Sequence, residues 1–199
     1  ILSILTLESA HSIRFLYQHF LSGITEKSLN VFYYACSYAK VDYSRFMNTT
    51  VRITLKLIPD SLQTQPVFLC VDDTMVSKFG TKFENVSKLF DHAAHNGSNY
   101  LNGHCFVSVM LCVPVWNGDK VSYLSVPLGY RMWQKKESKL ELAASMIRQV
   151  MPEFLSKEHV IILCDSWYTK KNLVSIIDEY PNLDLIGNAR IDSVMYDLA

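Results

Sequence analysis

Two aspartates that directly follow apolar runs are the residues of this sequence best suited to chemistry. Asp72 follows the run "VFLCV", and Asp165 follows the run "VIILC". Acidic residues are depleted in strands and ionised carboxylates resist burial, so an acid in this place calls for a reason. If both runs are neighbouring parallel strands, their carboxyl ends meet at one edge of the sheet, where ligands bind in open α/β sheets.

A divalent cation is the partner that such a pair of carboxylates would need. Two carboxylates that lie close together and away from bulk water repel each other unless a cation lies between them. Oxygen ligands suit Mg²⁺ or Mn²⁺, and these ions support phosphate chemistry. Two such ions, roughly 3.5–4 Å apart, can activate an attacking hydroxyl and stabilise a leaving oxygen. The pattern therefore predicts a metal-dependent site for phosphate chemistry at Asp72 and Asp165.

Each aspartate also has a structural interpretation, which the residues alone leave open. An aspartate at the end of a strand often forms a turn or caps the next helix, and Asp165 stands before "SWYTKKNLV" in such a place. Asp73 follows Asp72 directly, and neighbouring residues of a strand point to opposite faces of the sheet. Only one of these two carboxylates can therefore point into a shared site.

Five apolar runs predict the strands that position these acids. The first is nearly continuous, which is typical of a strand covered on both faces. The Asn-Gly pair in "WNGD" is the strongest short-range signal of a hairpin, so the second and third strands should be antiparallel neighbours. The five runs are "VFLCVDD", "HCFVSVMLCVPVW", "KVSYLSVPLGYRMW", "HVIILCD" and "LDLIGNAR".

Two helices are predicted between the later strands. The segment "SKLE" reads as a capping box, with Ser138 as the N-cap and Glu141 at the third helical position. The order of elements is therefore β-β-β-α-β-α-β, and the predicted fold class is a mixed α/β sheet. The apolar stripes comprise Ala143, Met146, Ile147 and Val150 on the first helix, and Leu173, Ile176, Ile177 and Tyr180 on the second.

The rest of the chain and its composition limit the classes of function. Residues 1–62 read as helical, with a break at "IPDSLQTQP", and residues 64–199 form the α/β core. Nineteen basic and nineteen acidic residues argue against a histone-like nucleic-acid binder, while a local basic face stays possible. No apolar run is long enough for a membrane span, the five cysteines favour reduced thiols, and we expect a cytoplasmic protein. Since no methionine precedes Ile1, we expect a piece of a longer chain.

The segments "VDDTMVSKFG", "GHCFVSVMLCVPVW" and "LCDSWYTKKNLV" together resemble the DDE transposases encoded by bacterial insertion sequences. The resemblance covers residues 64–199 and implies an RNase H-like fold. It also implies metal-dependent cleavage of DNA and transfer of the freed 3′ end, with Mg²⁺ or Mn²⁺ as cofactor. The implied partners are transposon ends, target DNA and a second copy of the chain in a homodimeric synapse, and the implied location is the bacterial nucleoid.

The resemblance also implies roles for single residues. It favours Asp72 over Asp73 as the first catalytic and metal-binding acid, because the family's aspartate usually follows the apolar run directly, and it makes Asp165 the second. The family's third acid lies on a helix after the fifth strand. Glu179 comes too early for that role, and only nine residues follow "LDLIGNAR". We therefore expect this chain to be catalytically incomplete. Two alternatives remain: another RNase H-like nuclease, or a non-catalytic, domesticated remnant that binds DNA or a partner.

Several residues outside the acids are candidates for DNA contact. Lys78 belongs to the first family motif, and Trp167 follows Asp165 closely enough to stack on a displaced base. A basic cluster next to aromatic side chains suits phosphate contact with base stacking, although a solvated helix start explains it equally well. The histidines of the loop are better explained as polar loop residues than as metal ligands. The basic cluster comprises Arg131, Lys135, Lys136 and Lys139 beside Tyr130 and Trp133, and the histidines are His92, His95 and His104.

Overall fold

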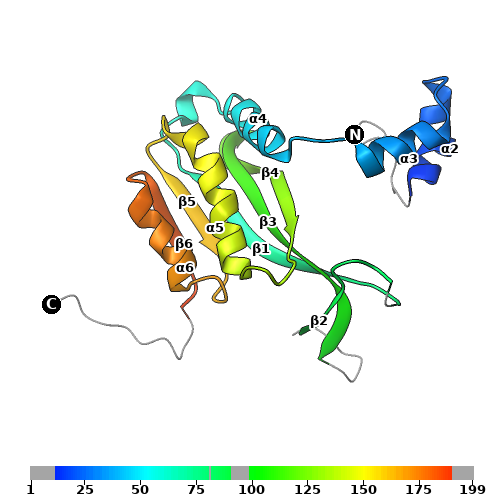
Figure 1. Cartoon of the computed structure of the whole chain (residues 1–199). Helices are drawn as coiled ribbons and strands as arrows, with labels where there is room; N and C mark the ends of the chain where they lie inside the picture. The colour runs from blue at the N-terminus through cyan, green and yellow to red at the C-terminus, as the bar shows by residue number, and fades with distance from the viewer. Residues whose placement is uncertain (1–11, 81, 91–98, 190–199) are drawn as a thin grey trace. The chain divides into compact units, whose positions relative to one another are not determined.

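The computed structural model describes residues 12–80, 82–90 and 99–189, and Figure 1 shows its elements. The chain forms two compact units, Ile1–Asp42 and Tyr43–Ala199. The sequence analysis grouped residues 1–62 as one helical region. The unit boundary instead assigns helix α4 (Tyr43–Leu55) to the unit that contains the sheet.

The first unit contains two short helices. α2 (Ile13–His19) is capped by Ser12, whose hydroxyl accepts a hydrogen bond of 3.1 Å from the backbone N–H of Phe15. A 3₁₀ turn, η1 (Leu21–Gly23), separates it from α3 (Leu29–Tyr38). None of the described residues of this unit is buried. The described part of the unit therefore has no hydrophobic core of its own.

The second unit is built on one mixed sheet of six strands (Figure 1). β3 is antiparallel to β1, β2 and β4, whereas β1, β5 and β6 pair in parallel. Without the short β2, the order β4-β3-β1-β5-β6 is that of an RNase H-like sheet, so the predicted fold class is confirmed. The strands are β1 (Val67–Ser77), β2 (Ser87–Phe90), β3 (Tyr100–Asn117), β4 (Lys120–Met132), β5 (Val160–Cys164) and β6 (Leu183–Gly187).

The predicted hairpin joins β3 and β4. Asn117 pairs with Lys120, so the two turn residues are Gly118 and Asp119, one position later than the Asn-Gly pair itself. Gly118 has a φ of 61°, a left-handed value that glycine adopts without steric cost. The strand β2 was not predicted, because four residues with two polar side chains give little periodic signal.

Three helices pack against one face of the sheet: α4, α5 (Lys139–Val150) and α6 (Lys171–Val174). The capping box of α5 is confirmed, since the N–H of Glu141 donates to the Ser138 hydroxyl at 3.1 Å and the N–H of Ser138 donates to the Glu141 carboxylate at 2.8 Å. The second predicted helix is shorter than expected, because after α6 the chain continues as a 3₁₀ turn, η4 (Ser175–Glu179).

The alternation along β1 shows which face these helices cover. Val67, Leu69 and Val71 are buried, whereas Phe68 and Cys70 are only partly buried. Burying a valine or leucine side chain fully contributes about 1.5–3 kcal/mol, so this face holds most of the core. Among the described residues, helices pack on the face of Val71, and the expected cover on both faces of β1 is not seen.

Candidate metal and nucleic-acid site

The two adjacent aspartates lie at the point where β1 parts from β5. The parallel pairing of β1 with β5 ends at Val71 and Cys164, and β1 then continues to Ser77 with β3 as its partner. The sequence analysis expected β1 to end at these acids, but the strand continues beyond them. Instead, the parallel sheet ends there, which leaves space beyond the carboxyl end of β5 on the side of Asp165.

Asp73, not Asp72, points to the face that the helices cover. Its carboxylate accepts a hydrogen bond of 2.6 Å from the Lys139 ammonium at the start of α5. It also accepts hydrogen bonds of 3.2 Å from the Tyr168 hydroxyl and 3.2 Å from the Cys105 thiol. The side chains of Asp73 and Lys139 are each 16% exposed, so water screens this ion pair only partly.

Asp72 lies on the opposite face of the strand and is exposed. Its Oδ1 accepts a hydrogen bond of 2.8 Å from the backbone N–H of Asp73, and its backbone carbonyl accepts one from the Ser108 hydroxyl. The alternation of the strand thus separates the two neighbours, as expected. The structure brings Asp73, the alternative of the sequence analysis, together with Asp165.

Asp165 begins the turn that follows β5. Its Oδ1 accepts hydrogen bonds from the backbone N–H groups of Trp167, at 3.0 Å, and Tyr168, at 3.3 Å. The turn-forming role is therefore real. The other carboxylate oxygen, Oδ2, has no hydrogen-bond partner among the described residues and is free to take a ligand.

A cavity of about 840 Å³ brings these residues together. Asp73 and Asp165 both line it, so the two carboxylates share one cavity. Lys139 and Trp167 also line it. Lys88 of β2, which is far from both residues in the sequence, contributes to the lining as well. The remaining lining residues are Met75, Leu89, Phe90, Trp133 and Ser166.

The charge and hydrogen bonds of Asp73 favour the protonated form of all three partners, and burial adds to this effect for Cys105 and Tyr168 but opposes it for Lys139. Burial acts to lower the pKa of Lys139, but the hydrogen bond and the charge of Asp73 outweigh it, and the pKa is raised. Burial, helped by the hydrogen bond to Asp73, raises the pKa of Cys105 to about 11. Burial first and Asp73 second also raise the pKa of Tyr168. All three groups are therefore donors at neutral pH.

The donors in the cavity suit a hard divalent cation. Mg²⁺ is usually held by one or two carboxylates, with water and substrate phosphates filling the other positions. Asp73 and Asp165 supply two carboxylates at one cavity. Within the described ranges, no group of three histidine, cysteine, aspartate or glutamate side chains is close enough to hold a metal by itself. The residues therefore fit a metal that is bound jointly with a substrate, rather than a closed structural site.

The two tryptophans of the cavity hold cations beside the acids. The Lys139 ammonium lies 5.6 Å from the ring centre of Trp133 and 5.2 Å from that of Trp167. Lys135 lies over Trp133 at 5.9 Å, and Lys170 lies over Trp167 at 4.7 Å. Cation–π contacts of this kind hold amine groups at an aromatic face. The cavity therefore has two carboxylates, and ammonium groups and aromatic rings lie beside them; these ammonium groups and rings are called the rim below.

Other predicted DNA contacts lie away from this cavity. Arg131 donates to the Ser145 hydroxyl at 2.8 Å and to the Gln149 side chain, so its guanidinium ties β4 to α5. Lys136 is exposed beside a separate shallow cavity, and Lys78 lies near the ring of Phe83, 5.6 Å from its centre. DNA contact by these residues stays a prediction.

The loop histidines, the cysteines and Glu179 have other surroundings. His92 and His95 lie outside the described residues, while the ring of His104 makes a hydrogen bond of 2.8 Å to the backbone carbonyl of Glu84. Glu179 is paired with Arg148 at 2.6 Å and does not line the cavity of Asp73 and Asp165. All five cysteines are free, and Cys105 and Cys112 are buried. Among the described residues, every helix is too short or too polar to cross a bilayer.

Lys139 is the contact of Asp73 that sequence reasoning assigned to a different role. It was placed in a basic cluster for DNA, yet it neutralises a carboxylate in a strand 66 residues earlier in the chain. One signal was present: Lys139 is the first residue of α5, where the helix dipole disfavours a cation by about 0.3–1 kcal/mol. The contact with the Asp73 carboxylate offsets this cost. Tyr168 and Cys105 gave no comparable signal.

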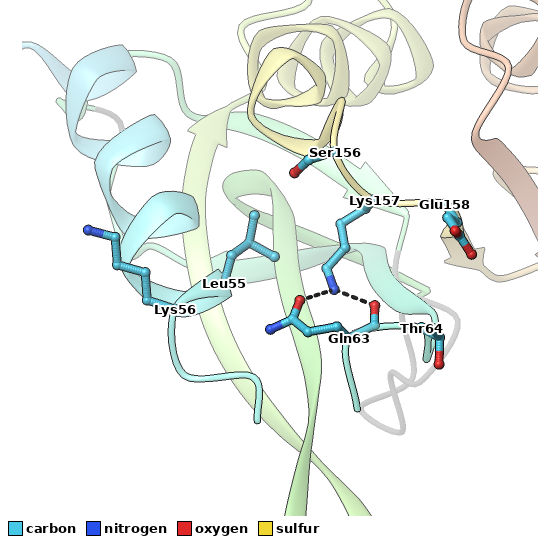
Figure 2. A pocket seen from close by; sticks show the side chains of 7 residues that line it. All are labelled: Leu55, Lys56, Gln63, Thr64, Ser156, Lys157 and Glu158. Atoms are coloured by element: carbon cyan, nitrogen blue, oxygen red, sulfur yellow. Dashed lines mark hydrogen bonds between the residues drawn. The ribbon is translucent and has the colours of Figure 1, made fainter. Parts of the chain in front are cut away.

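A second cavity, of about 450 Å³, lies at the opposite end of the parallel strands, where β1 and β5 begin (Figure 2). Lys157 is 7% exposed there and donates to the backbone carbonyl of Gln63 at 2.8 Å and to its side-chain oxygen at 2.9 Å. Burial lowers the pKa of Lys157. These bonds join the segment before β1 to the segment before β5, which indicates a structural role.

Comparisons with known proteins give weak matches. No protein-family model and no curated protein matches the chain. Among solved structures, the chain is similar to the Mos1 transposase paired-end complex with left transposon end, at 12% identity and a TM-score of 0.32, over 94% of this chain. A Mos1 mariner paired-end complex with Mn matches at 14% identity and a TM-score of 0.29. The chain spans 57% of either protein. The fold assignment rests on the strand order of the sheet.

Proposed function

We propose that this chain is part of the catalytic core of a DDE-type transposase, an enzyme that cuts DNA strands and joins the freed 3′ ends to a target. Asp73 and Asp165 are the metal-binding acids in this proposal, with Asp73 taking the role that the family resemblance gave to Asp72. The observation that supports it most is the cavity where carboxylates from β1 and from the end of β5 meet on an RNase H-like sheet.

The residues around the acids suit a DNA phosphate. A bound Mg²⁺ or Mn²⁺ would activate the attacking oxygen and stabilise the leaving one. Lys139 and Lys170 bring positive charge to the rim, and Trp133 and Trp167 bring aromatic faces. Positive charge attracts the DNA backbone, and aromatic faces stack on unpaired bases. Origin from a bacterial insertion sequence, a homodimeric synapse and a place at the nucleoid are further parts of the proposal.

The proposal is tested by calorimetric titration of Mn²⁺ into the wild type, Asp73→Asn, Asp165→Asn and Asp72→Asn. We expect binding in the high micromolar to millimolar range for the wild type, because two carboxylates make a partial oxygen site. Asp73→Asn and Asp165→Asn should abolish it, whereas Asp72→Asn, on the opposite face, should keep it. Circular dichroism checks that each variant is folded. Equal binding by all four proteins would reject the metal site.

A second titration separates the proposed enzyme from a DNA-binding remnant. A short DNA duplex with a free 3′ end is added before the Mn²⁺. If the DNA phosphates complete the coordination of the metal, the affinity for Mn²⁺ rises, and Asp73→Asn removes the rise. DNA binding that leaves the Mn²⁺ affinity unchanged would favour the remnant instead.

A further inference from the structure

Lys139 stands where a positive charge meets Asp73, one of the two acids of the proposed metal site. Its ammonium is 2.6 Å from Oδ2 of Asp73, and both side chains are 16% exposed. A divalent metal ion bound to this carboxylate would also be a cation, so it would take the same role as the ammonium group. An ammonium group this close to the same oxygen atom lowers the affinity of that oxygen for a divalent ion, because the two positive charges repel each other.

The surroundings of Lys139 fix it in this position. The rings of Trp133 and Trp167 both lie near the ammonium, with centres at 5.6 and 5.2 Å, and Lys139 itself is the first residue of α5. The helix dipole disfavours a cation at this end, so the contact with Asp73 must compensate for it. The position of the ammonium group is therefore stabilised by Asp73 and the two tryptophan rings, and not by the helix to which Lys139 belongs.

We propose that Lys139 is an internal counter-ion that competes with the divalent metal for Asp73 and leaves the carboxylate when the metal binds. This inference rests on the proposed function. Lys139 holds Asp73 in place in the metal-free protein together with Tyr168 and Cys105. When the carboxylate binds a divalent ion, the ammonium moves within the cavity, between the two tryptophan rings. Lys139 is a positioning residue in this scheme, and it sets the metal concentration at which the site fills.

The proposal predicts that removing Lys139 strengthens metal binding. Lys139→Met keeps most of the length of the side chain and removes the charge, so the metal no longer has to displace a cation. We expect the affinity for Mn²⁺ to rise about tenfold, since a neighbouring charge changes the binding of a cation at a carboxylate by at least this factor. A purely structural role of Lys139 would instead leave Asp73 badly placed and weaken binding.

Lys170→Met is the matched control. Lys170 also carries one positive charge and lies 4.7 Å from the ring centre of Trp167, but Asp73 is not among its hydrogen-bond or ion-pair partners in the described part of the chain. Its removal changes the net charge of the rim equally, and we expect a change in Mn²⁺ affinity of less than about threefold. Lys139→Gln serves as a second variant if Lys139→Met does not fold.

The experiment is calorimetric titration of Mn²⁺ into the wild type, Lys139→Met, Lys139→Gln, Lys170→Met and Asp73→Asn. A gain in affinity for the two Lys139 variants alone supports the proposal. An equal gain for Lys170→Met overturns it, because the effect is then general charge. Unchanged or weaker binding by the Lys139 variants overturns it as well, while wild-type binding that Asp73→Asn abolishes leaves the proposed function intact. No binding by any protein rejects both.

Discussion

Two lysines, one at each end of the parallel strands, show how the partner of a buried amine decides its role. Lys139 pairs with a carboxylate in the larger cavity, and the pair raises its pKa. Lys157 has two neutral oxygen partners, both from Gln63, and burial lowers its pKa (Figure 2). The first arrangement can exchange its cation for another cation. In the second arrangement the amine connects two chain segments through neutral oxygens, so no metal ion can replace it.

The largest stability effect is expected for Lys139→Met in the absence of metal. Removing the lysine leaves Asp73 partly buried with only two neutral donors, and we expect a loss of about 2–3 kcal/mol in the free energy of unfolding. Mn²⁺ should reduce this loss by about 1.4 kcal/mol, because it binds the folded state alone and binds the variant about tenfold more tightly than the wild type. Urea denaturation with and without Mn²⁺ measures both quantities. A loss that Mn²⁺ does not reduce would contradict the exchange of cations.

Lys157→Met should reduce stability less and should ignore the metal. The variant leaves two oxygens of Gln63 without their donor, and we expect a loss of about 1–2 kcal/mol. Since Lys157 lies at the opposite end of the strands from Asp73, the Mn²⁺ affinity should equal that of the wild type. Urea denaturation and calorimetry on the same preparation test the two statements, and a changed Mn²⁺ affinity would break the contrast between the lysines.

The two lysines should also give opposite dependences on pH. The folded-state pKa of Lys157 is below the ordinary value of 10.5, so its contribution to stability is fully present above 10.5 and is lost as pH falls through the folded pKa. The folded-state pKa of Lys139 is raised, so its contribution is fully present below 10.5 and is lost as pH rises through the folded pKa. We therefore expect the stability of the wild type relative to Lys157→Met to increase as pH rises towards 10.5.

In the same metal-free series, the advantage of the wild type over Lys139→Met should persist to pH 10.5 and decline above it. Thermal unfolding at closely spaced pH values, with both variants measured beside the wild type, provides the comparison. If the stability of the wild type relative to Lys157→Met and relative to Lys139→Met changed with pH in the same way, the carboxylate and carbonyl partners would be equivalent. This result would contradict the proposed difference between the two lysines.

The smallest effect is expected for Tyr168→Phe. The side chain is fully buried, and the change removes one hydrogen bond of 3.2 Å to Asp73 while Lys139 and Cys105 remain. We expect a loss of about 1 kcal/mol in stability and a small decrease in Mn²⁺ affinity, because Asp73 is held less firmly. Chemical denaturation and calorimetry measure these changes. An increase in Mn²⁺ affinity would mean that Tyr168 competes with the metal as Lys139 does.

The sheet was predictable from local patterns, whereas the partners of Asp73 were not. The apolar runs, the Asn-Gly hairpin and the capping box at Ser138 each depend on neighbours in the sequence, and the structure contains all of them. The choice between Asp72 and Asp73 depends on which face of β1 the helices cover, which is a matter of tertiary packing. Lys139 and Tyr168 are 66 and 95 residues from Asp73, and no periodicity connects them.

The length of β3 has a consequence for the motions of the site. Its 18 residues span roughly 60 Å at about 3.4 Å per residue, so one strand runs from the buried sheet, at Val107 to Val113, to the β2 pairing near Tyr100. Backbone amides at the buried end should exchange with deuterium slowly, and those near Tyr100 quickly. Cys105 lies between the two regimes and touches Asp73. Bending of the outer part of the strand would therefore pivot next to Asp73, the acid of the proposed metal site.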